Sequence, residues 1–122
     1  MLKLLLSFKY ALNGIKNLIE TEKNFKIQLL LALTTLILGF YFNISKSEWI
    51  LIIICFASVL TAEAFNSAIE KLVDLVSPDY NEKAGKIKDI AAGAVLITAL
   101  NTAIIGMIIF IPKILNRFYV LF

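Results

Sequence analysis

Three long stretches of this chain are apolar and contain no charged residue: Ile27–Ser45, Trp49–Ala62 and Ile90–Pro112. The hydrocarbon core of a bilayer is about 30 Å thick and needs about 20 apolar residues in a helix. The first and third stretches are long enough, and the second reaches 21 residues at Ile69 if polar side chains are accepted near its end. The pattern therefore predicts three transmembrane helices. Their expected ranges are about 25–42, 49–76 and 89–111.

The first 21 residues show a different, two-sided pattern. Leu4, Phe8, Leu12, Ile15 and Ile19 recur at spacings of three or four, while lysines and other polar residues occupy another face. This periodicity predicts an amphipathic helix at about 3–21, lying in the membrane interface. The expected fold is an all-α membrane protein with one domain over residues 1–122. A soluble bundle with a very apolar core is the alternative, and the hydropathy disfavours it.

The connections between the predicted spans follow from capping and helix-breaking residues. Ser45 or Ser47 can cap the second span, which at 28 residues measures roughly 42 Å and must project beyond the hydrocarbon. Ser77-Pro78 ends it, and residues 79–88 are expected to form a polar loop. The third span is expected to end before Pro112.

The basic residues predict how the chain is oriented in the membrane. Nine of the twelve lie before the first span or around the second connection, and three lie on the other side. The positive-inside rule then places the N-terminus and the second connection in the cytoplasm, so the protein is expected in the cytoplasmic (inner) membrane. The net charge of +3 suits an anionic lipid surface and needs no nucleic acid as a partner.

One helical stripe of polar residues follows the apolar part of the second span. Glu63, Asn66, Glu70 and Asp74 fall within about 80° of the helix circumference. Ionisable groups at membrane depth are costly and mark functional sites. The chain has no histidine, which removes the usual general base and zinc ligand. Any acid–base or metal chemistry must therefore use carboxylates, amides, hydroxyls and lysines.

The spacing of the carboxylates separates their roles. Glu63 and Glu70 are roughly 10 Å apart along the helix axis, too far to share one Mg²⁺ ion. Glu70 needs a second carboxylate, and Glu22 is expected at the same cytoplasmic level, with the Asn66 amide nearby. Two carboxylates with phosphate oxygens and water are an ordinary way to hold magnesium with a nucleotide. Glu63, the deepest, is suited to act as a base toward a lipid hydroxyl.

Lys88 and Asp89 place a phosphate-pairing cation beside a carboxylate at the start of the third span, although no Walker loop is present. Purely structural interpretations stay open for each residue taken alone. Glu63 could pair with a lysine, and Asp89 could be an ordinary helix N-terminal acid. Glu70 with Lys71, or Glu82 with Lys83 and Lys86, could be solvated ion pairs.

Several segments resemble a known family. These are Glu63-Ala-Phe-Asn66-Ser-Ala-Ile-Glu70-Lys-Leu-Val-Asp74 and Lys88-Asp89-Ile-Ala-Ala-Gly-Ala-Val. They are similar to the small prokaryotic membrane lipid kinases, the diacylglycerol and undecaprenol kinases. Ser7-Phe-Lys-Tyr10-Ala-Leu-Asn-Gly14-Ile and Glu22-Lys-Asn-Phe25-Lys-Ile look like the undecaprenol kinase branch. The likeness extends over nearly the whole chain.

The resemblance implies ATP- and Mg²⁺-dependent phosphorylation of a membrane lipid hydroxyl at the cytoplasmic face, in a homotrimer whose sites can be shared between protomers. Undecaprenol is the expected acceptor, and diacylglycerol is the alternative. By position, Glu63 matches the proton acceptor, and Glu22 and Glu70 match the magnesium ligands. The residues that match nucleotide-contacting or supporting positions are Tyr10, Asn66, Asp74, Asp79, Tyr80, Asn81, Lys88 and Asp89. Asn81 and Gln28 depart from the family, standing where relatives often carry histidine.

Two other functions would also use glutamates in a membrane. A small proton-coupled transporter would place them near the midplane, whereas these cluster at the basic, cytoplasmic end. An oligomeric cation pore needs one ring of acidic residues per level, which leaves Lys88-Asp89 and the N-terminal helix unexplained. A lipid kinase explains more of the pattern than either.

Overall fold

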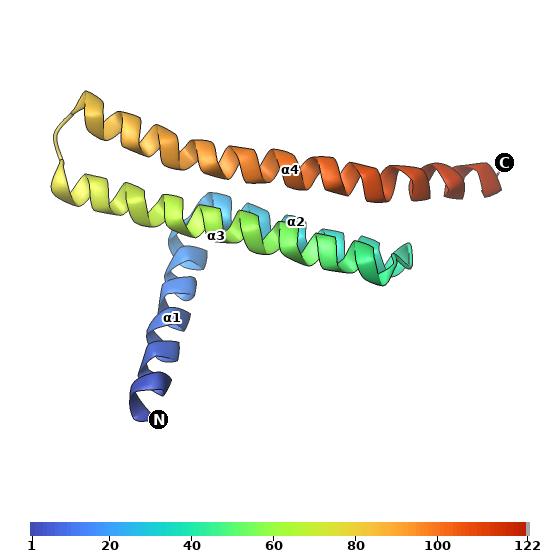
Figure 1. The fold of residues 1–122 in the computed structure, drawn as a ribbon, viewed down its shortest axis with the longest axis horizontal. Coiled ribbons are helices and arrows are strands. Elements are labelled where there is room, and N and C mark those ends of the chain that lie inside the picture. The colour runs from blue at the N-terminus through green and yellow to red at the C-terminus, as the bar shows by residue number, and fades with distance from the viewer. Residues whose placement is uncertain (122) are drawn as a thin grey trace.

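The computed structural model describes the backbone of residues 1–121 and the side chains of residues 1–119, and all its regular structure is helical. The helices are α1 (Leu2–Thr21), α2 (Lys23–Tyr41), α3 (Lys46–Val76) and α4 (Glu82–Leu121). Helices α2, α3 and α4 run side by side, and α1 projects steeply from them (Figure 1). Each of the three bundled helices is long and apolar enough to cross a membrane, which confirms the prediction of three long apolar helices.

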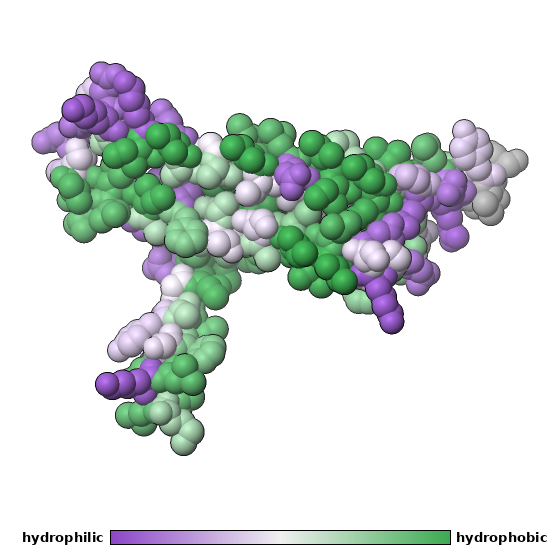
Figure 2. All heavy atoms as spheres, in the orientation of Figure 1, coloured by the Kyte–Doolittle hydropathy of each residue, from purple (hydrophilic) through white to green (hydrophobic). Residues whose placement is uncertain are grey.

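The surface of the bundle follows the predicted membrane pattern. A hydrophobic belt covers its middle, and hydrophilic residues gather near its two ends (Figure 2). Most large apolar side chains of α2, α3 and α4 are exposed, as lipid-facing residues would be. In α1, Leu18 is half-buried and the other residues are exposed. The core of the bundle is a small cluster near the α2–α3 turn, formed by Ile44, Ile52, Ile109 and Phe110.

The tight turn between α2 and α3 depends on local backbone chemistry. Asn43 adopts a left-handed conformation with φ of 48°, which asparagine tolerates better than most residues. The Ile44 N–H then donates to the carbonyl oxygen of Gly39 at 3.1 Å, which closes the end of α2. Ser45, one of the two predicted candidates, caps α3 and forms a reciprocal capping box with Glu48. Because this box sets the first turn, α3 begins at Lys46, three residues before the predicted start.

The predicted start of the third span was wrong by about two turns. Residues 82–88 are helical, so the connection between α3 and α4 is only residues 77–81. The Asn81 side chain accepts hydrogen bonds from the backbone N–H groups of Lys83 (2.9 Å) and Ala84 (3.2 Å), as a helix N-cap does. Glu82 and Lys86 form an ion pair one turn apart at 2.6 Å. Residues 82–88, which were predicted to be part of a loop, therefore make the first two turns of α4.

The predicted end at Pro112 was also wrong, because α4 continues through this proline to Leu121. Proline removes one backbone hydrogen bond, but transmembrane helices tolerate it when neighbours hold both sides. Here Lys113 pairs with Glu48 at 3.0 Å, and the Arg117 guanidinium lies 5.8 Å from the centre of the Tyr41 ring. These contacts to α3 and α2 hold the helix beyond the proline.

Candidate functional site

The polar stripe of α3 faces the inside of the bundle. Glu63 is 3% exposed and Asn66 is 8% exposed, and Ser67 beside them is buried. On the same stripe, Ile52 and Val59 are also buried, one to three turns toward the α2–α3 turn. One helix face thus changes from apolar to acidic within the bundle, as the spacing predicted. Glu70 is half-buried and Asp74 is exposed, so the stripe leads from the interior to the surface.

Glu63 lies against α2. The Gln28 side chain donates from Nε2 to Glu63 Oε2 at 3.4 Å, and the Gln28 carbonyl oxygen Oε1 is buried without a partner in the described structure. The contact of Gln28 with Glu63 was not predicted, although a polar amide within an apolar span is itself a sign of function.

Asn66 organises the next turn of the stripe. Its Nδ2 donates to Glu70 Oε1 at 2.9 Å, which fixes the direction of that carboxylate. Its own carbonyl oxygen, Oδ1, is buried and has no hydrogen-bond donor in the described structure. A buried acceptor without a donor is rare in native proteins and leaves room for a ligand to supply one.

Glu22, at the break between α1 and α2, forms a contact that the sequence did not predict. Lys71 Nζ lies 2.9 Å from Glu22 Oε1, so Lys71 pairs with Glu22 and not with its neighbour Glu70. The same ammonium group donates to Asn17 Oδ1 at 3.3 Å and to Thr21 Oγ1 at 3.4 Å. The hydrogen bond from Lys71 lowers the pKa of the Glu22 carboxyl below its usual value, against a smaller opposing effect of burial.

The predicted magnesium ligands, Glu22 and Glu70, offer carboxylate oxygen atoms, and Asn66 adds a carbonyl oxygen without a hydrogen-bond partner in the described structure. Among the described residues, no three acidic, histidine or cysteine side chains are close enough to enclose a metal alone. Mg²⁺ bound with a nucleotide uses one or two carboxylates and takes its other ligands from phosphates and water. Glu22, Glu70 and the free Asn66 Oδ1 suit that arrangement by their chemistry.

The predicted nucleotide residues divide into two groups. A cavity of about 220 Å³ at the α3–α4 connection brings together Asp74, Asp79, Tyr80, Asn81 and Lys88. Lys88 Nζ contacts Asp74 Oδ1 across this cavity and links the two helices. Tyr10, on α1, and Asp89, on α4, are exposed and lie outside the lining of this cavity. The Asn81 side chain is engaged in capping α4.

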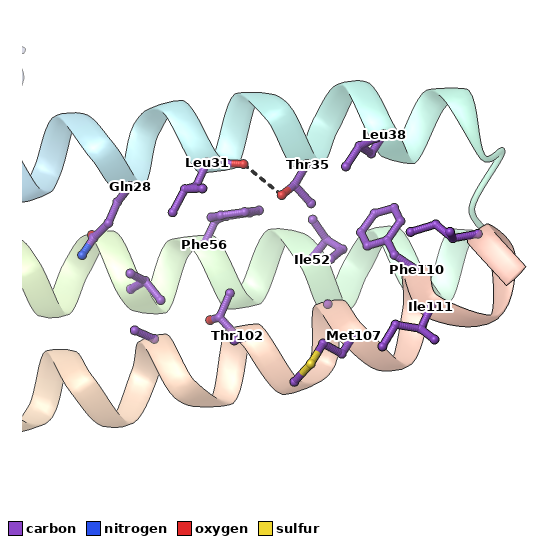
Figure 3. Close-up of a pocket in the computed structure, with 15 residues that line it drawn as sticks. Gln28, Leu31, Thr35, Leu38, Ile52, Phe56, Thr102, Met107, Phe110 and Ile111 are labelled. Carbon is purple, nitrogen blue, oxygen red and sulfur yellow. Dashed lines mark hydrogen bonds between the residues drawn. The ribbon is translucent and has the colours of Figure 1, made fainter.

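A second, apolar cavity extends from Gln28 along the three bundled helices. It measures about 480 Å³ and is lined by α2, α3 and α4 (Figure 3). Gln28 stands at one end, and Phe110 and Ile111 stand at the other. The Thr35 hydroxyl donates to the Leu31 carbonyl oxygen at 2.9 Å, so this polar group is satisfied within its own helix. The cavity therefore presents a hydrocarbon-like surface that begins beside the Gln28–Glu63 contact.

Comparison with known proteins identifies relatives of the chain. The model of the family described as "Prokaryotic diacylglycerol kinase" matches residues 9–110. An undecaprenol kinase of Bacillus subtilis is 39% identical over 88% of this chain and 87% of its own length. A diacylglycerol kinase of Synechocystis is 32% identical over 93% and 65%, respectively. A diacylglycerol kinase of Haemophilus influenzae is 33% identical over 85% and 89%. These matches favour a lipid kinase over the transporter and the pore.

Proposed function

Because this chain belongs to the prokaryotic diacylglycerol kinase family of integral membrane lipid kinases, we propose that it transfers the γ-phosphoryl group of ATP to a lipid hydroxyl at the cytoplasmic face. One observation carries the proposal: the buried Glu63 carboxylate lies beside Gln28, at the end of an apolar cavity. A lipid chain in that cavity would bring its hydroxyl group to Glu63.

Glu63 takes the proton of the lipid alcohol in the proposed reaction. The alcohol oxygen forms a bond to the γ-phosphorus, the bond between this phosphorus and the β,γ-bridging oxygen breaks, and ADP leaves. Glu63 then holds the proton until it returns to solvent. General-base assistance of this kind contributes about 10²- to 10⁴-fold to a rate. The Gln28 N–H fixes Oε2 of Glu63, which leaves Oε1 for the alcohol.

Glu22 and Glu70 would hold Mg²⁺, which neutralises charge on the phosphates when bound. Asn66 directs Glu70 by the 2.9 Å hydrogen bond. We assign the cavity around Asp79, Tyr80 and Asn81 to the nucleotide, with Lys88 as a partner for phosphate and Asp74 as its support. Tyr10 and Asp89 would complete this site from α1 and α4.

Undecaprenol is the acceptor that we favour, and diacylglycerol is the alternative. The Bacillus subtilis relative, named undecaprenol kinase, supports this choice. We further propose a homotrimer in the cytoplasmic membrane, with α1 in the cytoplasmic interface. The exposed apolar side chains of α1 and the basic N-terminal segment support that placement.

The test uses the full chain, purified in detergent, with ATP, Mg²⁺ and either undecaprenol or dioleoylglycerol. We expect radiolabelled phosphate from γ-labelled ATP to appear in the lipid, with a higher kcat/KM for undecaprenol. Glu63→Gln should abolish the product, whereas Glu48→Gln, at the other end of α3, should retain it. A higher kcat/KM for dioleoylglycerol would reassign the acceptor. If neither alcohol becomes labelled, the proposal is contradicted.

A further inference from the structure

The ammonium group of Lys71 lies among three oxygen acceptors from the C-terminal end of α1 and the residue after it. Glu22 Oε1 is 2.9 Å away, Asn17 Oδ1 is 3.3 Å away and Thr21 Oγ1 is 3.4 Å away. A carboxylate, an amide carbonyl and a hydroxyl are the oxygen types that bind small cations. These three oxygen atoms therefore form a cation site, and the cation that occupies it is the ammonium group of Lys71.

The proposed function assigns a second cation to the same carboxylate, because Glu22 is one of its two magnesium ligands. An ammonium group and a divalent ion cannot both contact one carboxylate oxygen without strong repulsion. Lys71 and a divalent ion are therefore alternative partners of the Glu22 carboxylate.

We propose that Lys71 is a built-in counter-ion, which occupies the cation site at Glu22 in the metal-free protein and leaves it when a divalent cation binds. This inference rests on the proposed function, which places the divalent ion at Glu22. The lysine is suited to such an exchange because its side chain is 52% exposed and sits on a flexible stem. The Glu22 side chain is 24% exposed, so a hydrated ion can reach it from solvent.

The exchange has a structural consequence for α1. The three contacts of Lys71 link α3 to the end of α1, and this ammonium group connects the projecting helix to the bundle. When Lys71 leaves, the hydrogen bonds to Asn17 and Thr21 are lost with the ion pair. Binding of the divalent cation thus loosens the attachment of α1 to α3.

The test measures cation binding by the full chain in detergent, without ATP or lipid, using Mn²⁺ as a spectroscopic probe of free ion. Lys71→Gln removes the competing charge and should increase Mn²⁺ affinity about three- to tenfold. Lys71→Arg keeps the charge and should stay within about twofold of the parent. Lys86→Gln is the matched control, because it breaks another lysine–glutamate pair, with Glu82 at 2.6 Å, and should leave the affinity unchanged.

A second measurement separates a counter-ion from a purely structural link. Thermal unfolding in EDTA should show Lys71→Gln below the parent, and saturating Mn²⁺ should reduce this difference. Unchanged or weaker Mn²⁺ affinity in Lys71→Gln, with the same loss of stability in both conditions, would overturn the inference. Failure of the proposed function would give a different result. The parent would then form no lipid phosphate, but it would still bind Mn²⁺, and Glu22→Gln would still weaken that binding. Loss of that sensitivity would overturn the inference as well.

Discussion

The two ends of α3 use the same helix in opposite ways. Toward the α2–α3 turn, its inward face is apolar, and Glu48 is satisfied by the Ser45 cap and by Lys113. Toward the α3–α4 connection, the same face buries Glu63 and Asn66, and two buried acceptors, on Gln28 and Asn66, have no donor in the described structure. Polar groups left incomplete in this way reduce stability, so the contrast separates an end that stabilises the bundle from an end suited to bind ligands.

The largest expected effect comes from the ligand-binding end. Glu63→Gln keeps the size of the side chain but removes the base, and it should reduce lipid phosphorylation by about 10²- to 10⁴-fold. Thermal stability should be unchanged or higher, because a buried acidic group becomes neutral. Initial rates with saturating ATP and lipid, together with Tm, measure both effects. Retained activity in a correctly folded variant would exclude Glu63 as the proton acceptor.

At the α2–α3 turn, a substitution should change the stability of the bundle. A Cβ atom at Gly39 would lie 2.6 Å from Trp49 Cη2 and 3.1 Å from Ile44 Cδ1, so Gly39→Ala forces the indole to move. We expect a loss of about 1–3 kcal/mol in the free energy of unfolding. Gly14→Ala is the matched control, because nothing lies within 4 Å of its new Cβ. Equal stability of the two variants, by reversible unfolding in mixed micelles, would show that the turn is not tightly packed.

Two substitutions in the lining of the apolar cavity, at Gln28 and at Thr35, test whether the effect on the rate is confined to the end beside Glu63. Gln28→Leu removes the N–H that fixes Glu63, and kcat should fall about tenfold, as for loss of one charge-assisted hydrogen bond. Gln28→Glu offers no such donor and should not restore the rate. Thr35→Val, toward the other end of the cavity, alters a hydroxyl bonded to its own helix and should change kcat less than about twofold. Similar losses in both variants would indicate a general packing effect.

The smallest effect concerns acid sensitivity near Glu22. Its folded-state pKa is depressed by Lys71, so the pair stabilises the fold above the ordinary value of 4.5. That stability is lost as the pH falls through the lower folded-state pKa. In EDTA, the parent should therefore have a slightly higher Tm than Glu22→Gln at neutral pH, and the two should converge as the pH falls from the ordinary value through the lower folded-state pKa. A difference that stays constant through this range would contradict the role of the charge.

The helix pattern was readable from the sequence because it depends on local periodicity. The three apolar stretches became α2, α3 and α4, and the Ser45 cap and the Ser77-Pro78 end of α3 followed from local chemistry. The alignment of Glu63, Asn66 and Glu70 on one helix face also followed, since spacings of three and four fix one side of a helix. These features need no knowledge of the other helices.

The two errors in helix boundaries have different physical causes, one distant in the sequence and one local. Because proline usually ends a helix, the third span was predicted to end before Pro112. Contacts with Glu48 and Tyr41 instead hold the helical residues beyond it. Residues 79–88 looked like a loop because their polarity was visible, whereas the capping geometry of Asn81 was not. A pair between Lys71 and Glu70 was one open alternative, and the structure instead pairs Lys71 with Glu22, which lies far away in the sequence.

By itself, then, the sequence determined the number of long apolar helices and the family of enzymes to which the chain belongs. It also determined that one face of α3 changes from apolar to acidic along its length. Only the tertiary structure decided that Lys71 faces Glu22, that Gln28 reaches Glu63 and that an apolar cavity begins at this contact. The physical reason is that helical periodicity is set within a few residues, whereas the partner of a buried charge depends on how helices far apart in the chain pack together.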